Sequence, residues 1–252
     1  MKSKKNSTLL LVTILILGVI LACEIIPPEP ERDHSEDYGE YTFDPNTILD
    51  SLAKGDLNRF ISITETLSTP TPQTSNDIQL EFTDLLYIAQ KFHQFHWSEP
   101  VADWNLHQLQ YQVECSNFKG KPSFLEIVLY KIIRSQETDT RLVHTIQIGH
   151  PDGTIYWTEA TRYPVNENWQ VIDLTKNTIS AEEALKIAEG NGGMEVRLSA
   201  DNNCRINILA PDLSKKEWLV RYASYSPDTG WRYLLEVYVD KTSGEFRVVH
   251  PK

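Results

Sequence analysis

The sequence predicts an α+β protein in which short helices pack on antiparallel sheets. Two segments, 77–175 and 176–252, each begin with apolar residues at helical spacing and continue with stretches in which apolar and polar residues alternate. Turn sequences such as HPDGT at 150–154 and DKTSGE at 240–245 separate these stretches, as in hairpins of antiparallel strands. Since the helix precedes the strands in both segments, we predict two helix-plus-sheet units. The repeated order leaves open that they are a diverged duplication.

The first unit, residues 77–175, is predicted to begin with a helix. Thr83 is a suitable N-cap, and the apolar residues after it recur at helical spacing. From Leu109 the period changes to two, which is typical of a strand with one buried face. The helix is expected to bury Leu85, Ile88, Ala89, Phe92 and Phe95, and strands are expected at 109–113, 124–133, 142–148 and 155–157.

The second unit, residues 176–252, is predicted to begin with a short helix that has clear start and stop signals. Ser180 and Glu183 have the spacing of a capping box. Gly190 and the pair Gly192-Gly193 are suited to ending the helix. Strands are expected at 195–199, 205–209, 218–225, 234–240 and 245–249.

Residues 1–22 are predicted to be a cleaved export signal. Three lysines supply a positive start, and the apolar run over 9–23 would form about 22 Å of helix at ~1.5 Å per residue. This length falls short of a hydrocarbon core roughly 30 Å thick, and Pro27-Pro28 would end any extension of the helix. A cleaved signal therefore fits better than a spanning helix, although an uncleaved N-terminal anchor and a simple secretory signal stay open.

The end of this leader, Ile20-Leu21-Ala22-Cys23, resembles the lipobox of bacterial lipoproteins. In that signal a small residue directly precedes the cysteine that receives diacylglycerol. The resemblance implies lipidation of Cys23 and attachment to the cell membrane, facing outside the cytoplasm. Two or three acyl chains on one cysteine make a stable anchor, whereas a single chain binds marginally.

Residues 23–76 are predicted to connect the anchor to the folded units. The acidic, proline-rich segment 23–43 cannot bury enough apolar surface to offset its ordering entropy, so it is expected to act as a tether. In the segment 44–76, Asp44-Pro45 has the pattern of a helix start. The short helix is expected to end before Gly55, and a low-complexity linker follows over 66–76.

The overall charge is acidic. The formal net charge is −11, and removing the three lysines of the leader changes it to −14. This charge argues against nucleic acid as a partner and against a basic patch that binds anionic lipid headgroups. An acidic surface mainly keeps an anchored protein soluble.

Lipidation of Cys23 leaves Cys115 and Cys204 as an even pair. In an oxidising compartment outside the cytoplasm, such a pair is expected to form a disulfide bond. The alternative is two buried free thiols, each behaving as a small hydrophobic side chain.

The C-terminal unit resembles a PepSY-type domain. The resemblance rests on ISAEEALKIAEGNGG at 179–193, WLVRY at 218–222 and LEVYVDKTSGE at 235–245, which occur in the family's order. In that family a short helix packs on an antiparallel sheet that ends in a hairpin. The resemblance implies a non-catalytic interaction or regulatory module, since PepSY-type domains are associated with inhibiting or chaperoning secreted peptidases and with sensing outside the cell.

Metal-ligand residue types gather in one stretch of the sequence: His93, His96, Glu99, Asp103 and His107. The spacing His93-x-x-His96 puts the two imidazoles on neighbouring faces of a helix. Zinc enzymes more often use the i, i+4 pair of H-E-x-x-H, in which the glutamate serves as base. We therefore predict no metal site and no cofactor here, and expect the histidines to cap an aromatic core at the end of the helix.

The sequence also offers no catalytic motif. It contains no G-x-S-x-G elbow, and no cysteine stands in an electropositive stretch. We therefore predict no catalytic residues and no enzyme.

Four aromatic residues of the second unit, Trp218, Tyr222, Trp231 and Tyr233, are candidates for an interface with a secreted protein or peptide. Half of the aromatics in alternating strands should face away from the core, and exposed Tyr and Trp are typical interface anchors. The competing interpretation is that a one-sheet domain needs these residues to cover its helix. The alternative function is a solute- or peptide-binding lipoprotein with a ligand groove between the two units.

Overall fold

The computed structural model describes residues 36–63, 79–116, 118–134, 139–150, 152–162, 169–211, 215–227 and 230–251. The leader with Cys23 and the linker over 66–76 lie outside the described residues. The described residues from 36 to 251 belong to one compact unit.

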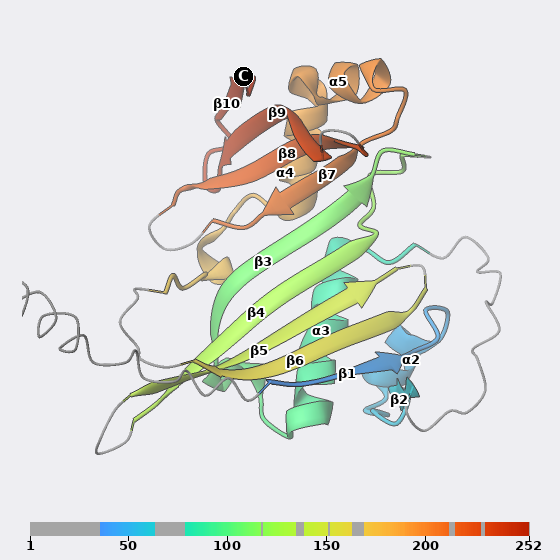
Figure 1. Cartoon of the computed structure of the whole chain (residues 1–252), viewed down its shortest axis with the longest axis vertical. Coiled ribbons are helices and arrows are strands. Elements are labelled where there is room, and N and C mark those ends of the chain that lie inside the picture. The colour runs from blue at the N-terminus through green and yellow to red at the C-terminus, as the bar shows by residue number, and fades with distance from the viewer. Residues whose placement is uncertain are drawn as a thin grey trace, which may run out of the picture. The chain divides into compact units, whose positions relative to one another are not determined.

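In the described part of the chain, ten antiparallel strands form one sheet in the order β10-β9-β8-β7-β3-β4-β5-β6-β1-β2 (Figure 1). The strands are β1 (Glu36–Thr42), β2 (Ile61–Ser62), β3 (Asn105–Glu114), β4 (Phe124–Ile133), β5 (Thr140–Gly149), β6 (Thr154–Arg162), β7 (Arg205–Leu209), β8 (Glu217–Ser226), β9 (Gly230–Asp240) and β10 (Phe246–Val249).

The helices lie on one face of this sheet. They are α2 (Ile48–Ala53), α3 (Phe82–Trp97), α4 (Ala181–Ala188) and α5 (Met194–Ser199), and a kinked turn, Glu189–Gly193, joins the last two. α3 contacts β4 and β5, whereas α4 contacts β8 and β9. Both lie behind the sheet in Figure 1, so the face toward the viewer carries no helix among the described residues.

The predicted fold class, α+β with short helices packed on antiparallel sheets, is wrong. One ten-stranded sheet dominates the structure, and the two predicted units share it. The halves, α3 with β3–β6 and α4 with β7–β10, join through antiparallel pairing of β3 with β7 from Gln110↔Leu209 to Glu114↔Arg205. An unpaired edge strand exposes a row of backbone donors and acceptors, and this pairing removes two such edges.

A disulfide bond joins Cys115 to Cys204 just beyond the paired ends of β3 and β7. The two Cα atoms are 5.2 Å apart, within the range that disulfide geometry allows. The backbone N–H of Cys115 also donates to the carbonyl of Cys204 at 3.1 Å, so the cysteines extend the β3–β7 ladder by one pair. Both are buried in the hydrophobic core, which includes residues of both halves.

α3 begins two residues earlier than the sequence indicates. Its N-cap is Glu81 rather than Thr83, and Asp84 completes the capping box by accepting the Glu81 backbone N–H at 2.8 Å. A carboxylate can replace the usual hydroxyl at this position because it also accepts from the free backbone N–H groups of the first turn.

Part of the predicted tether belongs to the sheet. Residues 36–42 form β1, which pairs along its whole length with β6, from Glu36↔Ala160 to Thr42↔Thr154. Gly39 of this strand lies against the indole of Trp157, where an added Cβ would come within 2.8 Å of the ring nitrogen. The acidic composition of this segment does not indicate a strand, because the strand is stabilised by its pairing with β6.

The segment 195–199, predicted as a strand, forms most of helix α5. Its alternation of Val196 and Leu198 fits either element, but Leu198 is 54% exposed. Arg197 turns back to form an ion pair with Glu189 at 2.8 Å, which stabilises the helical turn. Gly192 has a φ of 104° and provides the kink between α4 and α5.

Among the residues that the structure describes, none of the helices is long and apolar enough to cross a membrane.

Candidate functional site

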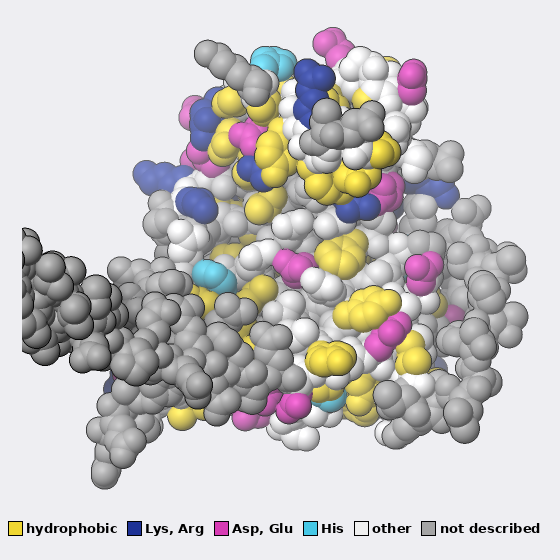
Figure 2. Space-filling model, in the orientation of Figure 1, with side chains coloured by type: hydrophobic (Ala, Val, Ile, Leu, Met, Phe, Trp, Pro, Cys, Tyr) yellow, Lys and Arg dark blue, Asp and Glu magenta, His cyan; other side chains and the backbone are white. Residues whose placement is uncertain are grey.

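The helix-free face of β7–β10 carries exposed aromatic side chains interleaved with charges. Tyr225, Trp231 and Tyr233 are 56%, 50% and 45% exposed. Tyr225 pairs directly with Trp231 across β8 and β9, and their rings lie 5.4 Å apart. In Figure 2, which looks onto this face, hydrophobic and basic side chains gather over this half of the sheet. We call Tyr225, Trp231 and Tyr233 the aromatic patch.

Arginines hold the rings of this face in place. The guanidinium of Arg205 lies 5.1 Å from the ring centre of Trp231, and that of Arg221 lies 4.4 Å from the ring centre of Tyr233. Arg221 also donates to Glu236 at 2.7 Å. Cation–π contacts restrict the rotation of an exposed ring, so less entropy would be lost when a partner covers it.

Two of the four predicted interface residues belong to the core instead. Trp218 and Tyr222 are 3% and 0% exposed. The Trp218 indole N–H donates to the carbonyl of Ile179 at 2.8 Å, and the Tyr222 hydroxyl donates to Glu189 at 2.9 Å. Burial raises the pKa of the Tyr222 phenol above its usual range. The strand alternation places these two side chains under α4, whereas Trp231 and Tyr233 project from the opposite face.

A groove of about 840 Å³ lies toward the other ends of β8 and β9, where Glu217, Leu219 and Tyr238 line it. Arg247 of β10 crosses it, donating to both carboxylate oxygens of Glu217 at 3.0 Å each and stacking 3.5 Å from the ring centre of Tyr238. At the other side His107 stacks on Trp169 and its Nδ1 lies 3.0 Å from the carbonyl oxygen of Gln170. The groove therefore has polar walls of both charges.

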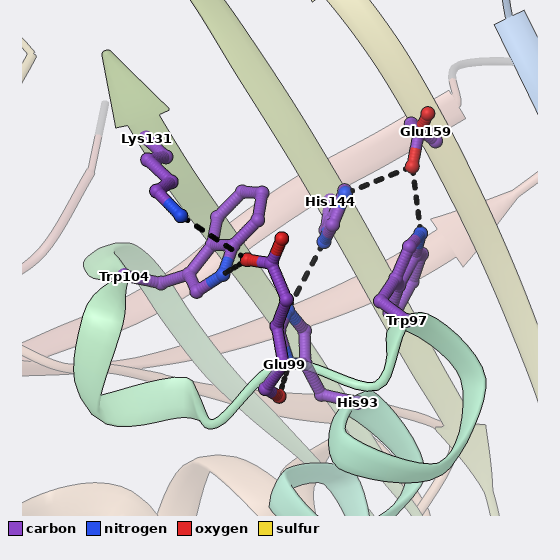
Figure 3. Close-up of polar contacts among 7 residues, drawn as sticks. All are labelled: His93, Trp97, Glu99, Trp104, Lys131, His144 and Glu159. Carbon is purple, nitrogen blue, oxygen red and sulfur yellow. Dashed lines mark hydrogen bonds and ion pairs between the residues drawn. The ribbon is translucent and has the colours of Figure 1, made fainter. Parts of the chain in front are cut away.

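A second cluster lies on the opposite face, between the end of α3 and the strands β5 and β6 (Figure 3). His93 and His144 are 0% and 1% exposed. The imidazole of His144 is held between two indoles, with ring centres 3.9 Å from those of Trp97 and Trp104. Burial lowers the pKa of His144 to about 3 and also lowers the pKa of His93.

Hydrogen bonds link these side chains into a chain. His93 Nε2 lies 3.0 Å from His144 Nδ1, and His144 Nε2 lies 3.0 Å from Glu159 Oε2. The Trp97 indole N–H donates to the same oxygen of Glu159 at 2.7 Å. We call His93, His144 and Glu159 the histidine chain.

Beside this chain, Glu99 accepts from the Trp104 indole at 2.8 Å and from Lys131 at 3.3 Å. The hydrogen bond from Trp104 is the main cause of the lowered pKa of the Glu99 carboxyl, and Lys131 adds to it. The Glu99 side chain is therefore held by donors other than the histidines.

The five residues considered as metal ligands do not converge. His93 and Glu99 meet in the cluster, whereas the ring of His96 lies tilted against that of Trp157, with the ring centres 4.0 Å apart. His107 lies at the groove and Asp103 is exposed in a 3₁₀ turn. Within the described residues, no group of three or more His, Cys, Asp or Glu side chains is arranged to hold a metal ion.

Sequence reasoning missed His144 and Glu159. His144 is in phase with Ile146 and Ile148, whose side chains are buried against the helices, and it pairs directly with Glu159 across β5 and β6. A histidine at an apolar position of a buried strand is the signal that would have pointed to it, because a buried polar side chain requires a hydrogen-bonding partner.

Comparisons with known proteins leave the family open. No family model matches the chain, and no curated protein matches it. Among solved structures, the full-length peroxisomal multifunctional enzyme type 2 from Drosophila melanogaster matches at 10% identity with a TM-score of 0.21. The match covers 94% of this chain and 51% of that one, so the chain spans about half the length of the enzyme. A likeness at this level carries no argument about fold or activity.

Proposed function

We propose that this protein is a lipoprotein anchored through Cys23 outside the cytoplasm, and that it acts as a non-catalytic interaction module. Its partner is a secreted protein or peptide that binds the aromatic patch. The observation that carries the proposal is the exposure of Tyr225, Trp231 and Tyr233 on a helix-free sheet face, with arginines stacked on two of the rings. Tyr, Trp and Arg are the residue types enriched among the binding hot spots of protein interfaces.

Two further features support this proposal. A disulfide bond such as Cys115–Cys204 forms and persists in oxidising compartments and is rare in the cytosol. The resemblance of 179–193, 218–222 and 235–245 to PepSY-type domains also points to a regulatory module rather than an enzyme.

The first test is capture of partners from a cell-envelope extract with the mature domain. We expect Trp231→Ala/Tyr233→Ala to reduce the captured partner at least tenfold, since hot-spot residues each contribute about 2 kcal/mol or more. The matched control is Tyr156→Ala, which removes an aromatic ring of 48% exposure from β6. Equal capture by the double variant and the wild type would place the binding surface elsewhere.

The second test concerns the anchor. Replacing Cys23 by serine is expected to abolish lipidation and to leave the precursor uncleaved by the lipoprotein peptidase, because serine lacks the sulfur that receives diacylglycerol. Membrane fractionation and the intact mass of the protein measure both effects. An unchanged mass and unchanged membrane association in the variant would exclude a lipid anchor at this residue.

A second candidate function, binding of a small solute or peptide, has one specific observation in its favour. A cavity of about 440 Å³ lies between the first turns of α3 and α4, and its lining includes Phe82, Leu86 and Trp218. Asn177 also lines it, and both polar atoms of that side chain are buried without a partner among the described residues. A solute bound there would change the fluorescence of Trp218, and Trp231→Ala would leave that change unaffected.

A further inference from the structure

Three consecutive contacts link the histidine chain to the backbone that follows α3 and link its members to one another, ending at β6 (Figure 3). The first joins the carbonyl oxygen of Glu99 to His93 Nδ1 at 3.0 Å. The second joins His93 Nε2 to His144 Nδ1, and the third joins His144 Nε2 to Glu159 Oε2, each at 3.0 Å. Both ring nitrogens of both histidines are therefore used.

Three contacts require three hydrogens. A backbone carbonyl can only accept, so His93 Nδ1 must carry one of them. A neutral imidazole carries one N–H, so two neutral histidines supply two hydrogens and leave one contact empty. That contact would bring two lone pairs to 3.0 Å in a buried site, with the full cost of an unmade hydrogen bond.

We propose that His93, His144 and Glu159 together bind one proton more than two neutral imidazoles and a carboxylate, and that this proton locks the end of α3 onto β5 and β6. The three groups then have no net charge as a set. This inference goes beyond the proposed binding function and does not depend on it.

The surroundings place the extra proton in the contact between His144 and Glu159. Burial between two indoles disfavours a full charge on His144, in line with its lowered pKa. The Glu159 side chain is 33% exposed, so this contact is also the route for exchange with water.

The other titratable groups facing the chain do not supply the missing hydrogen. The ring of His96 of α3 lies tilted against that of Trp157, and burial lowers the pKa of His96. The Glu99 carboxylate after α3 accepts from Trp104, and Lys131 of β4 donates to that same carboxylate.

The proton count predicts how the unfolding equilibrium depends on pH. Above about pH 7 the unfolded chain has neutral histidines and an ionised glutamate, so it binds one proton fewer than the folded chain. The contribution of the extra proton to stability is therefore present at lower pH and is lost as the pH rises. Each pH unit raises the unfolding constant about tenfold until the folded chain gives up that proton.

Glu159→Gln separates this proposal from a merely structural role. With its nitrogen in place of the shared oxygen Oε2, the glutamine amide donates to His144 Nε2 permanently, so the variant needs no extra proton. Trp97 then loses its acceptor, at a cost that does not depend on pH. The ratio of the wild-type unfolding constant to that of the variant should rise about tenfold per pH unit above roughly pH 5.5, until the folded wild-type chain gives up the extra proton. Glu195→Gln is the matched control, since Glu195 is exposed on α5. The ratio of the wild-type unfolding constant to that of Glu195→Gln should not change with pH.

Denaturant unfolding across this pH range measures the ratio. A flat ratio for Glu159→Gln would overturn the proposal. Neutron diffraction on the wild-type protein at pH 7 gives an answer even if the variant does not fold. Three hydrogens in the three contacts are expected, and two would overturn the shared proton.

Discussion

Loss of the Cys115–Cys204 disulfide is expected to lower the free energy of unfolding by about 2–5 kcal/mol. The bond closes a loop between residues that are 89 positions apart. In the chain-entropy model a loop of this length stabilises the folded state by nearly 5 kcal/mol, and measured values are usually smaller. The bond also lies at the end of the β3–β7 pairing, which is the junction between the two halves of the sheet.

The measurement is denaturant unfolding of wild-type protein with and without reductant, next to the Cys115→Ala/Cys204→Ala variant. Reduction removes the cross-link but keeps both buried sulfur atoms. The difference in unfolding free energy between the reduced wild type and the double alanine variant therefore isolates the packing contribution of the two side chains. Because one sheet spans both halves, we expect a single transition in every sample. An unchanged midpoint after complete reduction, or two transitions that ignore reductant, would contradict this account.

The parts of the fold that the sequence predicted depend on local signals. The capping box at Ser180 is present, with the serine hydroxyl accepting from Glu183 N–H at 3.1 Å. The β-rich composition of 124–133 and 142–148 marks β4 and β5, which pair as neighbours. Each of these signals involves residues close in the chain, so a pattern in the sequence is enough to predict the element.

The merging of the halves could not be predicted in this way. Alternation shows which residues of a strand share a face, but it does not identify the strand beside it. Gln112 of β3 and Asn207 of β7 pair although they are far apart in the chain, and nothing in either segment indicates the other. Trp218 is predicted at an interface for the same reason. The sequence does not show which face of β8 is covered by α4, so it does not show that the Trp218 side chain lies on the covered face.

The histidine chain shows a similar limit. The stretch from His93 to His107 attracted attention because its polar residues are close in sequence. The partners that complete the chain come from two other strands, and direct cross-strand pairing of His144 with Glu159 brings them together. The sequence shows the members of such a cluster as isolated polar residues at apolar positions of strands. It does not show which of these residues the pairing of the strands brings together.

Replacing Leu185 by alanine is expected to lower the free energy of unfolding by about 2–5 kcal/mol. The buried face of α4 otherwise consists of Ala181, Ala184 and Ala188, so Leu185 is the one large side chain on it. It is 2% exposed, and its loss leaves a cavity in the core between α4 and the strands β8 and β9. Small alanines allow the helix to approach the sheet closely, which limits how far neighbouring atoms can shift to fill the space.

Two other substitutions in the same helix calibrate this result. Ser180→Ala removes the cap and should cost about 1 kcal/mol. Lys186→Ala removes an ion pair with Glu182, and because the lysine side chain is 70% exposed and water screens the pair, stability should stay close to that of the wild type. Denaturant unfolding of the three variants should therefore rank Leu185→Ala well above Ser180→Ala, with Lys186→Ala near the wild type. A cost for Leu185→Ala no larger than that of the cap would mean that α4 is held by its ends rather than by burial against the sheet.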